Sequence, residues 1–356
     1  MKITKRKWRK LLYILRRTKL NKATWPFVFN LAKRFMYGVH RDARKDIPYP
    51  TTLMLELTNK CNLHCVTCPR EYDYGKAMRL GNMEKALAFK IIDECYPYLQ
   101  SIGLTGMGET LFAPVLQEVA AYIKAKKPSI VIFISTNANM PDFIEKITPV
   151  LPFIDTVQIS TDGVNDIYEN VRHGASFELL ARNIAALAPL AAAHGVDMMF
   201  NMVLTELNYR AMPSVVEFAA QNGIRFVNFT YFNLAIVTDI PIEYYQFFAS
   251  AGFQQMLAET KVMARKYPEI EVTGLDFPGN PGIRKCPLVW NHFQINYDGE
   301  VPPCCAKPFS KEYSFGNVSD RPVISVLNSA KAKEFRRCWV ENQPHEFCRK
   351  CHYVHL

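Results

Sequence analysis

The chain has 356 residues, of which 49% are hydrophobic, and a formal net charge of +10. This suffices for one large α/β domain and a smaller one, and it excludes global disorder. The ten cysteines gather mainly at two places, unlike an evenly spread disulfide framework, and no apolar stretch reaches the roughly 18 residues of a membrane-spanning helix. Because no secretory signal is evident, we expect a cytoplasmic protein whose clustered cysteines bind metal.

The positive charge lies in an N-terminal arm, residues 1–48. Residues 1–46 hold 15 Lys and Arg and 2 Asp and Glu, a balance of +13, so the remaining chain sums to 10 − 13 = −3. Apolar residues at helical spacing predict two short amphipathic helices: Trp8, Leu11, Leu12 and Leu15, then Phe27, Leu31 and Phe35 after Pro26. Such helices suit packing on the main domain, an anionic membrane, a nucleic-acid backbone or an acidic partner. We favour packing or a peripheral contact of residues 1–46 with the inner face of the membrane, and we do not expect a nucleic-acid partner.

Short apolar runs alternate with longer amphipathic stretches from about residue 49 to residue 271. Six β-then-α units in succession predict a parallel sheet with right-handed crossovers, either open or curled into a partial barrel. The predicted strands are Leu53–Leu57, Ser101–Leu104, Ile130–Ser135, Thr156–Ser160, Met198–Leu204 and Phe226–Tyr231. The predicted helices are Met83–Tyr98, Val115–Lys126, Asp142–Val150, Phe177–Ala193 and Met212–Gln221. In such folds the chemistry lies at the carboxyl ends of the strands.

Directly after the first predicted strand, Cys61, Cys65 and Cys68 stand at the spacing C-x3-C-x2-C. Three thiolates on one short loop can bind three irons of a four-iron cubane and leave the fourth iron open. The alternative is a zinc knuckle, which needs a fourth ligand such as His64.

The spacing resembles the signature of the radical S-adenosylmethionine (SAM) enzymes. The resemblance implies a partial (β/α)6 barrel in which Cys61, Cys65 and Cys68 hold a [4Fe–4S] cluster and the open iron binds SAM. It also implies that an electron cleaves SAM to a 5′-deoxyadenosyl radical, which abstracts hydrogen from an unactivated C–H bond. A flavodoxin- or ferredoxin-type protein would be the reductant. One departure is Thr67, because the family usually has an aromatic residue there, near the adenine.

The resemblance further implies which residues behind the second and fourth strands bind SAM: Gly106, Gly108, Glu109, Ser160, Asp162 and Arg172. Behind the third strand, the amide side chain of Asn137 suits a contact with the ribose of SAM. The segment Gly106-Met107-Gly108-Glu109-Thr110 is similar to the family's Gly-Gly-Glu-Pro, whose acid holds the amino group of SAM, but it departs at Met107 and Thr110. Arginine suits a carboxylate because its planar fork donates two hydrogen bonds. A turn or a helix N-cap is the alternative at Asn137.

The second cysteine group follows a Pro- and Gly-rich stretch, residues 272–285, which reads as a linker to a domain of residues 286–356. Phe293–Val301 predicts a β-hairpin with an Asp-Gly turn, which would bring Cys286 and Cys304 together. Downstream stands a C-x2-C pair, and the whole resembles the SPASM or twitch auxiliary-cluster domains of radical SAM enzymes. This implies one auxiliary [4Fe–4S] cluster held by Cys286, Cys304, Cys348 and Cys351. A zinc ribbon is the alternative.

Three further cysteines stand outside these ligand sets. Cys305 is an alternative to Cys304, since neighbours on a strand point to opposite sides. Cys338 can be a ligand, a hydrogen donor or a plain buried thiol, and Cys95 lies on the apolar face of a predicted helix.

The leading hypothesis is a radical SAM enzyme that acts on a sugar or on a lipid-linked or membrane-proximal molecule and uses the auxiliary cluster as an electron conduit. The first alternative is a peptide-modifying radical SAM enzyme of ribosomal peptide maturation. An alternative of another class is a non-enzymatic protein that binds zinc and nucleic acid.

Overall fold

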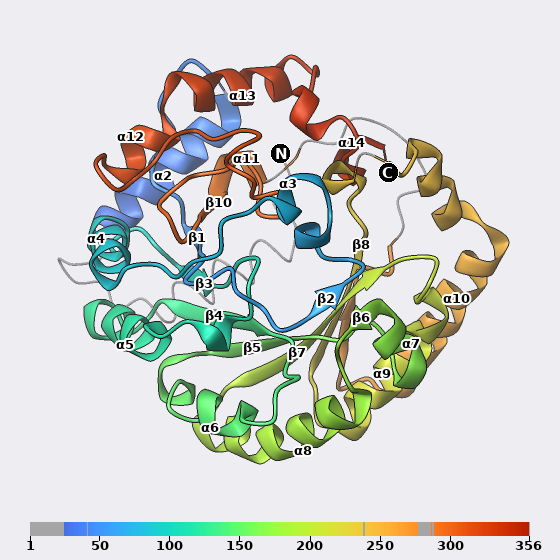
Figure 1. Ribbon diagram of the computed structural model, residues 1–356. Coiled ribbons are helices and arrows are strands. Elements are labelled where there is room, and N and C mark those ends of the chain that lie inside the picture. The colour runs from blue at the N-terminus through green and yellow to red at the C-terminus, as the bar shows by residue number, and fades with distance from the viewer. Residues whose placement is uncertain (1–24, 41, 238, 277–285, 287, 356) are drawn as a thin grey trace.

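The computed structural model describes residues 25–40, 42–237, 239–276, 286 and 288–355. The first predicted helix of the arm therefore lies outside the described residues. The second is α2 (Trp25–His40), and in Figure 1 it lies beside α12 (Val323–Leu327) and α13 (Ala330–Val340). No helix in the described part of the chain combines the length and the apolar character that crossing a bilayer requires.

The core of the molecule is one parallel sheet of eight strands, which curves around a central space with the helices outside (Figure 1). The order across the sheet is β10 (His292–Ile295), β1 (Thr52–Leu55), β3 (Ser101–Leu104), β4 (Val131–Thr136), β5 (Thr156–Ser160), β7 (Asp197–Leu204), β8 (Phe226–Tyr231) and β9 (Glu271–Thr273). The six predicted strands occupy the middle positions in chain order, which confirms the predicted α/β partial barrel. Two further strands are added at the edges: β9 was not predicted, and β10 falls on the first arm of the hairpin predicted over residues 293–301.

Five outer helices follow the predicted amphipathic stretches and pack on the sheet: α4 (Lys85–Cys95), α5 (Leu116–Lys126), α6 (Phe143–Ile147), α8 (Phe177–His194) and α9 (Met212–Gln221). A further helix, α10 (Ala251–Lys266), was not predicted. Burial alternates along β7, where Met198, Phe200, Met202 and Leu204 are buried and the residues between them are partly exposed. Since neighbouring side chains of a strand point to opposite faces, one face forms the core with the helices. The other face lines the interior and carries polar residues, such as Asn201 and Asn228, which hydrogen-bond each other.

Shorter elements form the loops at the carboxyl ends of the strands. A two-residue strand of the cysteine loop, β2 (His64–Cys65), pairs antiparallel with β6 (Arg172–His173). The other short elements before β9 are η2 (Pro69–Glu71), α3 (Asp73–Lys76), η3 (Thr110–Phe112), η4 (Leu151–Phe153), α7 (Asn165–Val171), η5 (Tyr209–Ala211), η6 (Leu234–Ile236) and η7 (Ile242–Ala249).

The C-terminal segment corrects the predicted hairpin. The Asp-Gly turn is present, with Gly299 at φ 83°, but β10 pairs in parallel with β1 and not with the chain after the turn. Residues 299–301 pair instead with residues 315–318. The physical reason is that β1 would otherwise be a sheet edge with unpaired backbone groups, and β10 satisfies it. The remaining helices are α11 (Leu288–Asn291), α12, α13, η8 (Glu346–Cys348) and α14 (His352–His355).

The structure bears on two other predictions about this region, the orientation of Cys304 and Cys305 and the linker over residues 272–285. Cys304 and Cys305 lie on an irregular segment and a turn, so the strand argument for opposite orientations is wrong. The predicted linker, residues 272–285, begins within β9, and residues 277–285 lie outside the described part of the chain. The proposed domain boundaries remain predictions.

Candidate active site

The three cysteines of the C-x3-C-x2-C loop line one cavity at the carboxyl ends of the strands. The cavity measures about 180 Å³, far more than a packing void between close-packed side chains. Six of the seven residues predicted to bind SAM line the same cavity: Gly106, Gly108, Glu109, Asn137, Ser160 and Arg172. Asp162 does not line it. The fold thus brings together side chains that are separated by more than one hundred residues in the sequence.

The cysteine loop is held by the segment that follows β5. Cys65 lies opposite Arg172 in the β2–β6 pair, and the Val66 amide donates to the Val171 carbonyl at 2.9 Å. The Asn62 side chain donates to the Asn139 carbonyl at 2.9 Å. These contacts fix the loop above the open end of the sheet and place a guanidinium beside a thiol.

The donor set fits an iron–sulfur cluster. Burial raises the pKa of Cys65 to about 12 and that of Cys68 to about 11, so these thiols need a cationic partner to ionise. In the described part of the chain no three His, Cys, Asp or Glu side chains converge as ligands of a single metal ion. A cubane does not require such convergence, because each cysteine binds a different iron.

A buried ion pair positions Arg172 at the cavity. Its Nη2 lies 3.0 Å from Oδ2 of Asp162, which is fully buried and also accepts from Thr67 Oγ1 and the Val203 amide. Burial opposes ionisation, but Asp162 and Cys65 together raise the pKa of Arg172 above its usual value. Asp162 thus contacts Arg172 and the strand ends, while its predicted contact with SAM stays a prediction. Thr67, where the family usually has an aromatic residue, is one of the partners of Asp162.

Arg172 has capacity for a further ligand. Its Nη1 lies 3.8 Å from the Cys65 sulfur, and its Nε is buried without a hydrogen-bond partner. A buried donor without a partner is costly, and a bound carboxylate would satisfy it.

Gly106 and Gly108, which were predicted to let the backbone approach SAM, let it approach other residues of the protein instead. A Cβ on Gly106 would stand 2.3 Å from the Glu56 side chain, and one on Gly108 would stand 2.6 Å from the carbonyls of Thr58 and Lys60. The Glu109 amide donates to the Lys60 carbonyl at 2.8 Å. The Gly106–Glu109 segment is therefore pressed against the residues that lead into the cysteine loop.

Glu109 is 2% exposed and is oriented by backbone amides. Asn137 N–H donates to its Oε2 at 2.7 Å, and Leu111 N–H donates to its Oε1 at 3.1 Å. Burial raises the pKa of Glu109. The Asn137 side chain bonds Asn62 and its Oδ1 accepts from the Asn139 amide, so Asn137 forms the predicted turn while also lining the cavity.

Sequence reasoning missed Glu56, which comes directly after β1 and is buried. Its Oε2 accepts from the Met107 amide at 2.7 Å, and its Oε1 accepts from the Tyr297 amide at 3.4 Å. Glu56 therefore links the glycine segment beside the cavity to the turn that follows β10. The only feature of the sequence that could have identified Glu56 is an acidic residue at the end of an otherwise apolar strand.

Burial raises the pKa of Glu56 to about 7, whereas its ordinary value is 4.5. The folded protein therefore keeps this carboxyl protonated to higher pH than the unfolded chain, and its contribution to stability is lost as pH rises from about 4.5 to about 7. We expect infrared difference spectra of the protein against Glu56→Gln to show a protonated carboxyl band that disappears with a midpoint near pH 7. A band already absent at pH 5 would contradict this.

The second cysteine group also gathers at one place. Cys286, Cys304, Cys348 and Cys351 line a small apolar cavity together with Trp339 and His352, and Cys305 and Cys338 do not line it. Burial raises the pKa of Cys286 to about 11, whereas a hydrogen bond from the neighbouring Cys305 thiol lowers the pKa of Cys304. The four predicted ligands thus lie around a common space despite the failed hairpin.

The adjacent cysteines provide a matched test. Because Cys304 lines the cavity and Cys305 does not, Cys304→Ser is expected to lower the iron of the anaerobically reconstituted protein from about eight atoms per chain to about four. Cys305→Ser is expected to keep about eight. Iron and sulfide assays measure this, and the reverse pattern would make Cys305 the ligand.

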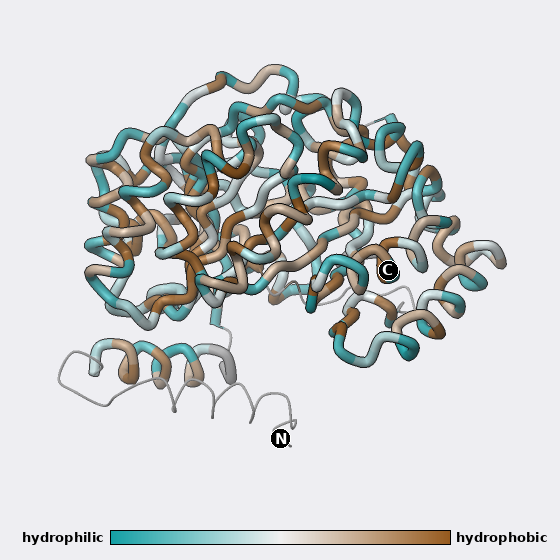
Figure 2. The backbone as a smooth tube through the Cα atoms, turned by 90° about the horizontal axis from the view of Figure 1, so that it is seen from below, coloured by the Kyte–Doolittle hydropathy of each residue, from teal (hydrophilic) through white to brown (hydrophobic). Residues whose placement is uncertain are grey.

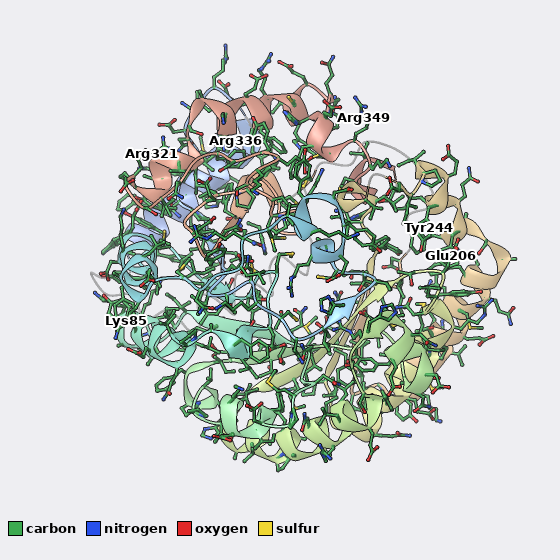
Figure 3. All side chains as sticks on the ribbon, in the orientation of Figure 1. Lys85, Glu206, Tyr244, Arg321, Arg336 and Arg349 are labelled. Carbon is green, nitrogen blue, oxygen red and sulfur yellow. The ribbon has the colours of Figure 1, made fainter. Side chains whose placement is uncertain are left out.

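Aromatic side chains connect the two cysteine sites. Phe232 packs on Tyr72, which follows the cysteine loop, and the next residue, Asn233, lines the second cavity. Phe232 also packs on Tyr244, whose hydroxyl accepts from the Glu206 amide at 3.1 Å (Figure 3). The loop that follows β8 therefore lines the second cavity and packs on a residue just after the cysteine loop of the first.

Comparison with known families agrees with this arrangement. The radical SAM superfamily matches residues 55–219, and the SPASM iron–sulfur cluster-binding domain matches residues 286–352. The chain therefore carries a radical SAM domain followed by a C-terminal SPASM domain. It is an enzyme whose cofactors are SAM, a SAM-binding [4Fe–4S] cluster and an auxiliary [4Fe–4S] cluster, which leaves the zinc alternative without support.

Three similar proteins cover most of the chain. The tungsten-containing aldehyde ferredoxin oxidoreductase cofactor-modifying protein of Pyrococcus furiosus is 23% identical over 84% of this chain and 86% of its own length. The antilisterial bacteriocin subtilosin biosynthesis protein AlbA of Bacillus subtilis is 24% identical over 86% of this chain and 65% of AlbA. The crystal structure of Streptococcus suis SuiB bound to the precursor peptide SuiA shares the fold, with a TM-score of 0.63 and 14% identity over 90% of this chain and 73% of SuiB.

Proposed function

We propose that this radical SAM enzyme modifies a peptide by removing a hydrogen atom from one of its unactivated C–H bonds. The observation that carries the proposal is the similarity to AlbA, a bacteriocin biosynthesis protein, over 86% of this chain. The shared fold with SuiB, which was solved with a precursor peptide, supports it. The peptide alternative thus has more support than the leading hypothesis of a sugar or a lipid-linked or membrane-proximal substrate.

We also propose the roles of the residues at the cavity. Cys61, Cys65 and Cys68 hold the SAM-binding cluster, and the bound cofactors supply the radical chemistry of the superfamily. Glu109 offers a carboxylate, oriented by two amides, to the amino group of SAM. Arg172, held by Asp162, offers its unpartnered Nε to the carboxylate of SAM. Ser160 lines the cavity where it can donate to the ribose or the carboxylate.

The auxiliary site is proposed to serve electron transfer. With Cys286, Cys304, Cys348 and Cys351 as ligands, each iron of a cubane has a protein ligand and none is open to substrate. The position of Asn233 in that cavity, directly after Phe232 beside the cysteine loop, supports electron exchange with a substrate bound at the barrel mouth. A flavodoxin- or ferredoxin-type reductant and the contact with a membrane remain proposals.

The substrate class is tested by incubating the reconstituted enzyme with SAM and dithionite and measuring 5′-deoxyadenosine. Short open reading frames beside the gene supply candidate peptides, and nucleotide sugars and lipid-linked sugars serve as comparison substrates. We expect a peptide to raise 5′-deoxyadenosine release and to lose or gain mass. Stimulation by a sugar or lipid and by no peptide would reject the proposal.

A second candidate is the modification of an enzyme cofactor. It is favoured by the Pyrococcus furiosus cofactor-modifying protein, because that similarity spans 86% of the relative's length. Here a cofactor-carrying protein, and not a free peptide, would stimulate 5′-deoxyadenosine release in the same assay.

A further inference from the structure

Helix α2 presents apolar side chains to the outside. Trp25, Phe29 and Met36 are 55%, 62% and 56% exposed and lie on one stripe, at positions i, i+4 and i+11. Phe35, beside the stripe, is 59% exposed. A helix on the surface of a globular domain normally turns its apolar stripe toward the core. Four large apolar side chains exposed on one short helix indicate a surface that contacts something else.

The inner face of α2 is fixed by polar contacts. Asn30 is 4% exposed and donates to the Tyr49 carbonyl at 2.9 Å. Arg34 donates to the carbonyls of Pro48, Tyr49 and Trp290, the last at 2.7 Å. Rotating the helix to bury its aromatic residues would break these bonds and leave the carbonyls without them. The outward position of the apolar stripe is thus determined by the sequence of the inner face.

The contacts of α2 place it at the amino ends of the strands, at the opposite end of the barrel from the candidate active site. Tyr49 precedes β1 and Trp290 precedes β10, while the Lys127 ammonium, which precedes β4, lies 4.7 Å from the centre of the Phe27 ring. In a parallel sheet these positions share the amino ends of the strands, and the cysteine loop lies at the carboxyl ends. Figure 2 shows α2 lying along one side of the body, below the curved sheet.

We propose that α2 docks the enzyme on an anionic membrane surface, with Trp25, Phe29 and Met36 inserted into the interface. Residues 1–46 have a balance of +13, from 15 Lys and Arg and 2 Asp and Glu, and Lys33 is exposed beside the stripe. Aromatic residues flanked by cationic ones suit the boundary between acyl chains and anionic headgroups. The same charge disfavours a second copy of the chain as the occupant, because two such arms repel each other.

The orientation has a consequence for the substrate. If the amino ends of the strands face the membrane, the cavity lined by the cysteine loop opens toward the aqueous side. The substrate then arrives from solution. A membrane contact through α2 therefore does not imply that the substrate is linked to a lipid. This inference does not depend on which substrate the enzyme modifies.

The test is sedimentation of the full-length, reconstituted enzyme with vesicles of phosphatidylcholine containing phosphatidylglycerol, compared with pure phosphatidylcholine. Binding is expected for the anionic vesicles and is expected to weaken with salt. The variant Trp25→Ser/Phe29→Ser/Met36→Ser is expected to bind at least about tenfold more weakly. Its SAM cleavage without substrate should be unchanged, because the stripe lies far from the cavity.

The matched control is Leu207→Ser/Val262→Ser, which replaces apolar residues that are 62% and 64% exposed elsewhere on the body. This control should bind anionic vesicles like the unchanged enzyme. If the triple variant binds anionic vesicles as tightly as the unchanged enzyme, the proposal is overturned, because the stripe is then not the surface that contacts the membrane. Failure of the unchanged enzyme to bind vesicles, with a change from dimer to monomer in the triple variant, would instead assign the stripe to a second copy.

Discussion

Replacing Cys65 by alanine is expected to abolish reductive cleavage of SAM and to lower the iron of the reconstituted protein from about eight atoms per chain to about four. Cys65 is buried, lines the cavity with Cys61 and Cys68, and lies beside the Arg172 guanidinium. Without its thiolate a cubane at this site retains two protein ligands. Iron and sulfide assays and chromatography of 5′-deoxyadenosine after addition of dithionite measure the two effects.

The control for this prediction is Cys95→Ala. Cys95 is also buried, 1% exposed, but it lies on the inner face of α4 among apolar side chains. This variant is expected to keep its iron and its SAM cleavage while losing some stability to the small cavity. Undiminished SAM cleavage by Cys65→Ala would remove the basis of the proposed site.

Replacing Arg172 by methionine is expected to have two separable effects. Removing one partner of a buried ion pair leaves Asp162 as a buried charge without its partner, which costs about 3 kcal/mol of stability. The affinity for SAM is expected to fall at least about tenfold, since Arg172 lines the cavity and its Nε has no protein partner. Thermal unfolding and equilibrium dialysis of SAM against the reconstituted enzyme measure the two effects.

The double variant Asp162→Asn/Arg172→Met separates the structural role from the role in binding. It removes the charge of Asp162 as well, so part of the lost stability should return, while the affinity for SAM should stay low. Recovery of SAM affinity together with stability would show that Arg172 only supports the fold.

Local signals made much of the barrel predictable. The strands of the sheet and the outer helices between residues 52 and 221 follow from short apolar runs and amphipathic periods, because each of these elements hides an apolar face against its neighbours. The cysteine spacing similarly pointed to a cluster, and most residues predicted behind the strands line the cavity with those cysteines. Carboxyl ends of parallel strands necessarily meet at one edge of the sheet, so the sequence order of these segments sufficed.

The errors and omissions arose where partners are distant in sequence. The Phe293–Val301 segment has the local pattern of a hairpin, yet β10 joins β1, which lies about 240 residues earlier in the chain. Glu56 contacts the Met107 and Tyr297 amides, and neither contact leaves a trace in the local pattern. A hydrophobic period identifies an element, but it does not identify which edge that element completes.

By itself, the sequence determined the class of fold, the two cysteine groups and the family, since periodicity and ligand spacing are properties of neighbouring residues. Only the tertiary structure decided the outward face of α2, because Asn30 and Arg34 find their acceptors outside the helix, in Tyr49 and in Trp290, which lies 256 residues from Arg34. It also decided that Asp162 is enclosed by Arg172, Thr67 and the end of β7. Amphipathic spacing gives a helix an apolar and a polar face. Which face is buried depends on the hydrogen-bonding groups that the tertiary structure places around the helix.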